Sequence, residues 1–168
     1  SAHFFSVEPA EQIRYRSEKA HTGNMIFEGE NPPAGAIFDY WSSSEDRPVQ
    51  FAVLDSERVA VAEMSHVGGR GVNRAVWDMR HTWIDGGNGA GRGPLVLPGT
   101  YIVRMTAGDV VAEQTFEVRE DPRFDDAPEV REAYTATMLE LWALSTAAAA
   151  LADELREVVG RLEGRGDA

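Results

Sequence analysis

The chain has 168 residues, of which 43% are hydrophobic, and it carries a formal net charge of -12. This length fits one ordinary domain with an appendage, and the apolar fraction allows a buried core, which argues against global disorder. The acidity argues against binding to nucleic acid or anionic membranes, and the absence of cysteine excludes disulfides, thiolate metal sites and cysteine nucleophiles.

The region from the N-terminus to about Arg119 consists of short apolar runs separated by turn residues. In chain order, the predicted strands are Gln12–Arg16, Gly35–Trp41, Val49–Leu54, Val59–Met64, Asn73–Met79, Thr100–Thr106 and Val110–Arg119. Apolar and polar residues alternate most clearly in the last two, which predicts one buried and one solvated face for each. About seven short antiparallel strands predict a mainly β fold, an immunoglobulin/fibronectin-type-III-like β-sandwich over residues 1–120.

The segment Ile84–Gly93 is dense in glycine and lies between two predicted strands. Because glycine has no Cβ and is conformationally free, we interpret this segment as a flexible loop. It does not match a phosphate-binding loop, since neither a lysine nor a helix start follows it.

Helical periodicity replaces the strand pattern after a linker at residues 121–128. Pro128-Glu129 is typical of a helix start, because proline fits the first turn and an acid there lies near the positive end of the helix dipole. We predict a long amphipathic helix over residues 129–163 and a flexible tail over 164–168. Such an apolar face is expected to pack, dock or oligomerise rather than stay in water. The residues of this face are Tyr134, Met138, Leu141, Trp142, Leu144, Leu151, Leu155, Val158 and Leu162.

Candidate catalytic and metal-binding residues are scattered along the chain. The four histidines show no spacing typical of metal ligands. The acidic pairs, Glu28 with Glu30 and Asp125 with Asp126, lie in predicted loops, whereas glycoside hydrolysis needs two carboxylates that face each other across a cleft. No nucleophile motif such as GxSxG or HExxH is present. We therefore predict no catalytic residue, no metal site and no cofactor.

Three residues near strand ends are candidates for ligand contact, namely Trp41, Trp83 and His81. Tryptophan side chains at such positions could form a stacking platform for sugar rings, so carbohydrate is one candidate ligand. The alternative is that Trp77 and Tyr101 fill the core and the remaining aromatics cap its edges. Both interpretations stay open at this point.

Three motifs follow one another in a fixed order. They are GVNRAVWDMR at 71–80, GPLVLPGTYIVRMTAG at 93–108 beyond the glycine-rich loop, and FEVREDPR at 116–123. With PAEQIRYR and NPPAGAIFDYW upstream, they resemble the C-terminal immunoglobulin-like domain of bacterial sortilin-type, BNR-repeat β-propeller proteins, often labelled glycosyl hydrolases. The resemblance covers roughly residues 3–160.

The resemblance implies a non-catalytic accessory domain, because ligand sites in such proteins belong to the propeller. It implies an extracellular, periplasmic or cell-surface location. The expected partners are a β-propeller of the same or an associated polypeptide and, through the helix, a second copy of the chain. The family's helical tail often folds back as a hairpin, whereas this sequence predicts one helix. Residues for which the resemblance implies structural roles are Asn73, Trp77, Asp78, Arg80, Pro98, Gly99 and Tyr101.

Two other functions remain as alternatives, a carbohydrate-binding module that uses exposed tryptophans and a hydrolase in its own right. Nucleic acid is not expected as a partner, given the acidic charge. A membrane span is not expected either, because no stretch approaches the ~20 apolar residues that cross a bilayer.

Overall fold

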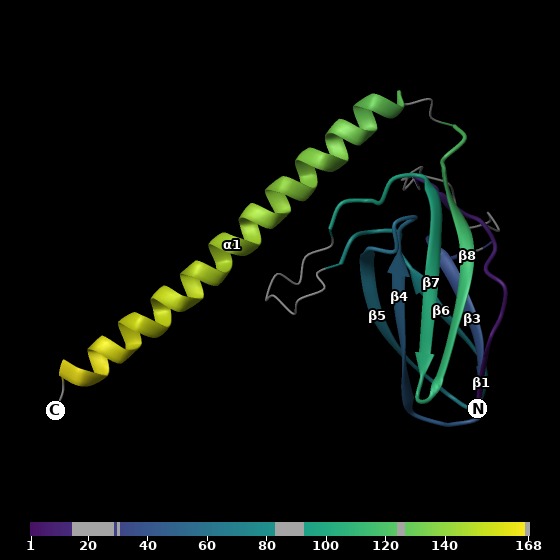
Figure 1. The fold of residues 1–168 in the computed structure, drawn as a ribbon, viewed down its shortest axis with the longest axis horizontal. Helices are drawn as coiled ribbons and strands as arrows, with labels where there is room; N and C mark the ends of the chain where they lie inside the picture. Colours follow the sequence, from purple (N-terminus) through teal and green to yellow (C-terminus); the bar gives the residue numbers. More distant parts are fainter. Residues whose placement is uncertain (15–28, 30, 83–92, 124–126, 167–168) are drawn as a thin grey trace, which may run out of the picture.

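A computed structural model describes residues 1–14, 29, 31–82, 93–123 and 127–166, with side chains as far as Arg161. The fold is mainly β, with two sheets and a C-terminal helix (Figure 1). The elements are β1 (Ala2–Phe4), β2 (Ala10–Gln12), β3 (Ala36–Ser42), β4 (Arg47–Leu54), β5 (Ala60–Gly68), β6 (Gly71–Trp77), β7 (Gly99–Ala107), β8 (Val110–Glu120) and α1 (Pro128–Gly166).

The strands form a three-stranded sheet in the order β1-β3-β6 and a five-stranded sheet in the order β2-β8-β7-β4-β5. Every pairing is antiparallel except that of β2 with β8, which is parallel. The N-terminal segment therefore contributes β1 to one sheet and β2 to the other. This arrangement ties the two layers together at the start of the chain.

Aromatic side chains fill the space between the two sheets. In β3, Phe38 and Tyr40 are fully buried, and the Phe38 ring stacks on Phe51 of β4 with ring centroids 5.6 Å apart. Phe116 of β8 meets Phe38 edge to face at 5.7 Å. Trp77 at the end of β6 is buried against Tyr101 and Phe116. Interdigitated rings of this size exclude water from the sandwich interior.

The six strands from β3 to β8 overlap the strands predicted from Gly35 onward, and the buried alternation of β7 is the predicted one. The structure has eight strands among the described residues, against about seven predicted. β1 was missed, and β2 ends at Gln12, where the predicted strand began. β6 ends at Trp77 rather than Met79, because Met79 adopts a φ of 57° and turns the chain out of the sheet.

Helix α1 has 39 residues and leaves the end of β8 at an angle, so that its second half extends away from the sandwich (Figure 1). It begins with Pro128 and Glu129, as predicted, and continues to Gly166, beyond the predicted end at 163. Gly160 does not end it, since a glycine costs a helix only about 1 kcal/mol relative to alanine. Of the predicted loop at Ile84–Gly93, only Gly93 lies within the described residues.

Candidate functional site

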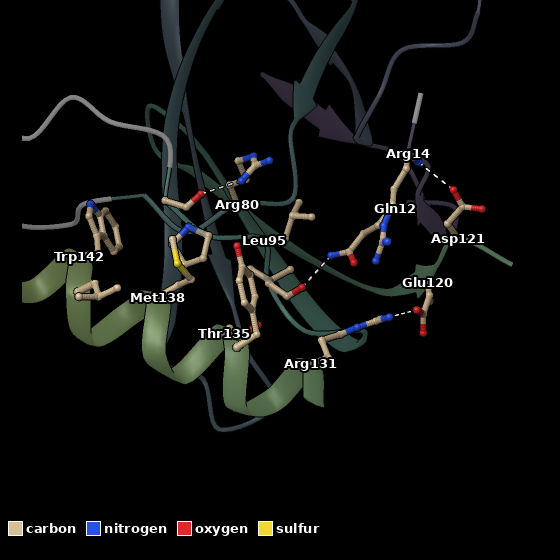
Figure 2. A pocket seen from close by; sticks show the side chains of 15 residues that line it. Gln12, Arg14, Arg80, Leu95, Glu120, Asp121, Arg131, Thr135, Met138 and Trp142 are labelled. Atoms are coloured by element: carbon tan, nitrogen blue, oxygen red, sulfur yellow. Dashed lines mark hydrogen bonds and ion pairs between the residues drawn. The ribbon is translucent and has the colours of Figure 1, made fainter. Parts of the chain in front are cut away.

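A pocket of about 430 Å³ lies between the first turns of α1 and the end of the sandwich. Figure 2 shows Arg131 pointing from the helix toward Glu120, with Thr135, Met138 and Trp142 following along the helix beside the sandwich. The lining of the pocket comes from five separate stretches of sequence, with these residues: Gln12, Arg14, Arg80, Gly93, Pro94, Leu95, Val96, Glu120, Asp121, Arg131, Tyr134, Thr135, Met138, Leu141 and Trp142.

One wall of the pocket is a short pairing between the segments before and after the predicted glycine loop. The backbone N–H of Val96 donates to the Met79 carbonyl at 2.9 Å, and that of His81 donates to the Pro94 carbonyl at 3.0 Å. The N–H of Gly93 donates back to the His81 carbonyl at 3.2 Å. A Cβ on Gly93 would lie only 2.4 Å from that carbonyl oxygen, so this close approach requires glycine.

The buried carboxylate of Asp121 joins the N-terminal segment to the linker that precedes α1. Its oxygens accept hydrogen bonds from the backbone N–H of Arg14 at 2.9 Å and from the Arg123 guanidinium at 2.6 and 2.8 Å. Arg123 also donates to the Arg14 carbonyl at 3.0 Å. The Arg123 side chain holds the pKa of Asp121 well below its usual range. In the sequence, residues 121–123 begin the predicted linker and end the FEVREDPR motif, and neither feature indicates a buried carboxylate.

A second ion pair attaches the helix itself. Arg131 in the first turns of α1 pairs with Glu120 at the end of β8, and both side chains are largely covered (Figure 2). One turn further along, Thr135 is buried against the sandwich. Gln12 of β2 donates to the Val96 carbonyl at 2.7 Å and closes the same region from the opposite side. These contacts fix the direction in which α1 leaves the domain.

The chemistry of the pocket is that of a packed junction. Its two carboxylates, Glu120 and Asp121, are adjacent in sequence, and each is paired with an arginine. The lowered pKa of Asp121 makes it a poor general acid, and the two carboxylates do not face each other across a cleft. Among the described residues, no group of three His, Asp or Glu side chains is placed to hold a metal ion.

The predicted ligand contacts lie apart from one another. Trp41 is half-buried near one end of β3, where it pairs with Val72. His81 follows the other end of β6, beyond the pairing of Trp77 with Ala36, and burial lowers its pKa. The structure therefore does not bring Trp41 and His81 together, and Trp83 lies outside the described residues. Sequence position alone could not reveal that Trp41 and His81 lie near opposite ends of β3.

The predicted helix face divides into two faces in the structure. Met138 and Trp142 are half-buried where they line the pocket, and Arg131 and Thr135, which no sequence pattern indicates, lie beside them. The other apolar residues are 44% to 66% exposed, and these are Tyr134, Leu141, Leu144, Leu151, Leu155 and Val158. The predicted face thus has a half-buried part beside the pocket and an exposed part, and its packing, docking or oligomerisation stays a prediction. The side chain of Leu162 lies outside the described ones.

The length and composition of α1 also bear on membrane association. Over Pro128–Arg161 the helix is long and apolar enough to cross a bilayer, so the expectation that no segment approaches this criterion does not hold. Residues 133–152 contain a single charged residue, Glu140. Helices of water-soluble proteins meet the same criterion, and it therefore assigns no membrane location.

Comparison with known proteins adds little. No protein-family model and no curated protein matches the chain. Among solved structures, it is similar to the crystal structure of CopC from Methylosinus trichosporium OB3b, with 16% identity and a TM-score of 0.34. That match covers 55% of this chain and 82% of the other. Similarity at this level carries no argument about function, and the resemblance to sortilin-type proteins stays a prediction.

Proposed function

We propose that this chain is a non-catalytic accessory domain with an immunoglobulin-like sandwich that mediates protein–protein assembly through α1. In this proposal it belongs to, or associates with, an exported sortilin-type β-propeller protein and works outside the cytoplasm. The observation that carries the proposal is the apolar face of α1 that its own sandwich leaves exposed.

Strand order supports the immunoglobulin type. In that fold, strands A, B and E form one sheet and strands C, F and G the other. Here β1-β3-β6 corresponds to A-B-E, and β8-β7-β4 corresponds to G-F-C. The Tyr101 hydroxyl donates to the Leu97 carbonyl at 2.7 Å, four residues upstream, as in the tyrosine corner of such domains.

Hydrogen bonds of the motif residues support a structural role for the motifs. The Asn73 amide donates to the Gly69 and Gly71 carbonyls at 2.8 and 3.0 Å and closes the turn between β5 and β6. The Trp77 indole N–H donates to the Arg80 carbonyl at 3.0 Å. Side chains engaged in this way specify the sandwich and are not directed at a substrate.

The exposed apolar face, which we call the α1 stripe, supports the assembly function. It comprises Val130, Tyr134, Leu141, Leu144, Leu151, Leu155 and Val158. Monomeric proteins rarely expose a continuous apolar surface of this kind, and an isolated helical segment in water is only marginally stable. Asp121, Arg131 and the pocket contacts hold the base of the helix, so that the sandwich presents the α1 stripe in a fixed direction.

The test compares the double variant Leu144→Glu/Leu151→Glu with the matched control Ala136→Glu/Ala143→Glu. All four positions are exposed, and only the first two lie on the α1 stripe. The sandwich transition is followed by near-ultraviolet circular dichroism of its packed aromatic rings. Both variants should keep the free energy of unfolding of the sandwich within about 0.5 kcal/mol of the parent, as expected for surface positions. A loss of about 2–5 kcal/mol in the first variant, as for core leucines, would place the stripe in this domain's own core and overturn the assembly function.

A further inference from the structure

We infer that the α1 stripe is the interface of an antiparallel homodimer, in which α1 of a second copy packs along it as a two-stranded coiled coil. This inference rests on the proposed assembly function and names its partner. Three features point to this dimer: the period of the stripe, its position relative to the sandwich, and the side chains that an antiparallel arrangement would bring together.

The period of the stripe is that of a coiled coil. Once Thr137, Ala148 and Leu162 are added to the stripe, its positions alternate in steps of four and three, which is the heptad pattern of a and d positions. A strict heptad repeat drifts about 20° per heptad on a straight helix, so a partner must wrap around it with a left-handed twist. The core positions are Val130, Tyr134, Thr137, Leu141, Leu144, Ala148, Leu151, Leu155, Val158 and Leu162.

The stripe is accessible to a second helix. Every core position from Val130 to Val158 is exposed. The residues buried or half-buried against the sandwich, Thr135, Met138 and Trp142, lie beside the stripe, whereas Tyr134 and Leu141 of the stripe border the pocket but remain 63% and 55% exposed. A second helix can therefore lie along the stripe without displacing the sandwich. From residue 147 onward the helix is exposed almost all round, and Figure 1 shows this half extending clear of the domain.

Side-chain size favours the antiparallel orientation. In a parallel dimer Ala148 would meet Ala148 of the second copy and leave a gap in the middle of the core. In the antiparallel register that places the two-fold axis between residues 149 and 150, Ala148 packs instead against Leu151 of the second copy. The same register pairs Leu144 with Leu155 and Leu141 with Val158, so the layers between residues 141 and 158 are filled.

Charge favours the same register. The positions that flank an antiparallel core on one side, called g, are Ala133, Glu140, Ala147, Glu154 and Arg161. The register of the apolar layers sets Glu140 beside Arg161 of the second copy, and the two-fold axis repeats this pair. A parallel dimer would instead set Glu140 beside Ser145 and Glu154 beside Val159, with no opposite charge. Only the antiparallel arrangement joins the lone acid of residues 133–152 to a base.

This register also places the two sandwiches at opposite ends of the paired helices. The first turns of each α1, which carry the sandwich, lie beside the last turns of the other. The domains therefore do not collide, and the dimer is an elongated rod with one sandwich at each end.

The first experiment measures mass and affinity. Light scattering and sedimentation of the full 168-residue chain should give a dimer. Leu144→Glu/Leu151→Glu should weaken it at least a hundredfold, and the control Ala136→Glu/Ala143→Glu should leave it unchanged, because two buried leucines each contribute roughly one to two factors of ten. Glu140→Arg and Arg161→Glu should each weaken the dimer roughly tenfold, and the two together should restore it.

The second experiment determines the orientation of the two helices. Because the chain has no native cysteine, any disulfide that forms must join introduced cysteines. Leu141→Cys and Val158→Cys are prepared separately and then mixed under oxidising conditions. The antiparallel register places these two positions opposite each other, so the mixed disulfide should form only on mixing. Disulfide formation within each separate variant would show a parallel dimer and overturn the inferred orientation.

Three outcomes overturn the second-copy assignment. They are a monomer at all concentrations, a dimer that survives Leu144→Glu/Leu151→Glu, and flotation of the chain with phosphatidylcholine vesicles in place of dimerisation. A monomer whose sandwich is insensitive to stripe charges leaves the proposed assembly function standing with a different protein partner. A sandwich that Leu144→Glu/Leu151→Glu destabilises overturns the proposed function as well, so the two failures are distinct.

Discussion

Removing one hydroxyl group, in Tyr101→Phe, tests whether the start of β7 is anchored as the structure indicates. The Tyr101 side chain is buried beside Trp77 and Phe116, and its hydroxyl donates to the Leu97 carbonyl at 2.7 Å. Phenylalanine keeps the ring and its packing. The change therefore isolates one hydrogen bond and the carbonyl group that loses it.

The expected loss in the free energy of unfolding is about 1–1.5 kcal/mol. A typical intramolecular hydrogen bond contributes about 0.5–1.5 kcal/mol net, and the upper part of this range applies because the Leu97 carbonyl is left without its donor in a half-buried site. Chemical denaturation followed by near-ultraviolet circular dichroism measures this loss. Tyr134→Phe, on the exposed α1 stripe, is the matched control and should change stability by less than about 0.5 kcal/mol.

The same variant makes a prediction about pH. Burial, assisted by the negative charge of Asp55, raises the pKa of Tyr101 from 10.0 to about 12. A raised pKa means that the folded state holds the proton more tightly than the unfolded state, so stability is fully present below pH 10 and declines as the pH rises toward 12. Tyr101→Phe should reduce this alkaline decline. If Tyr101→Phe matches the parent in stability at neutral pH and shows the same decline, the anchoring role of the hydroxyl is refuted.

Two further predictions concern the junction between the sandwich and α1. Asp121→Asn should lower stability near neutral pH but not in acid: the lowered pKa of Asp121 means that its contribution, present above 3.8, is lost as the pH falls below that value. When the free energy of unfolding is measured as the pH is lowered, the values for the parent and Asp121→Asn should therefore converge. A constant difference between them at every pH would contradict this role. Gly93→Ala should lower the free energy of unfolding by about 1–3 kcal/mol, because its Cβ would lie 2.4 Å from the His81 carbonyl oxygen. Gly69→Ala is the control and should not destabilise the protein, because open space surrounds that position. Equal melting temperatures for the two variants would contradict the close approach at Gly93.

The central strands could be predicted from sequence because their alternation is local. Residues Tyr101, Val103 and Met105 of β7 point inward and are buried, as their spacing predicts. Strands β1 and β2 have three residues each, too few to show alternation, and both exist through pairing with distant β3 and β8. Tertiary contact, not local propensity, determines such strands.

The helix could be predicted from sequence, but not the use of its faces. Spacings of three and four group Met138 and Trp142 with Leu141 and Leu144, although the first two are half-buried and the others are exposed. Periodicity identifies an apolar side and does not say which surface covers it.

The pocket itself could not be predicted, since its residues come from distant segments. The pairing of Arg131 with Glu120 joins a helix to a strand across the linker and leaves no local pattern. The signal available in sequence was weaker, namely the cluster of charged residues around Asp121-Pro122-Arg123 at the end of the strand pattern.

The parallel pairing of β2 with β8 has a mechanical consequence. The first of these strands lies near the start of the chain, and the second leads directly into α1. Tension between the N-terminal segment and the helix would pull two parallel neighbours in opposite directions along their length. Their hydrogen bonds, from Ala10 beside Val118 to Gln12 beside Glu120, would then bear the load together rather than open one after another. If the domain connected two large assemblies, force would pass through the β2–β8 pairing, and the two sheets would stay packed together.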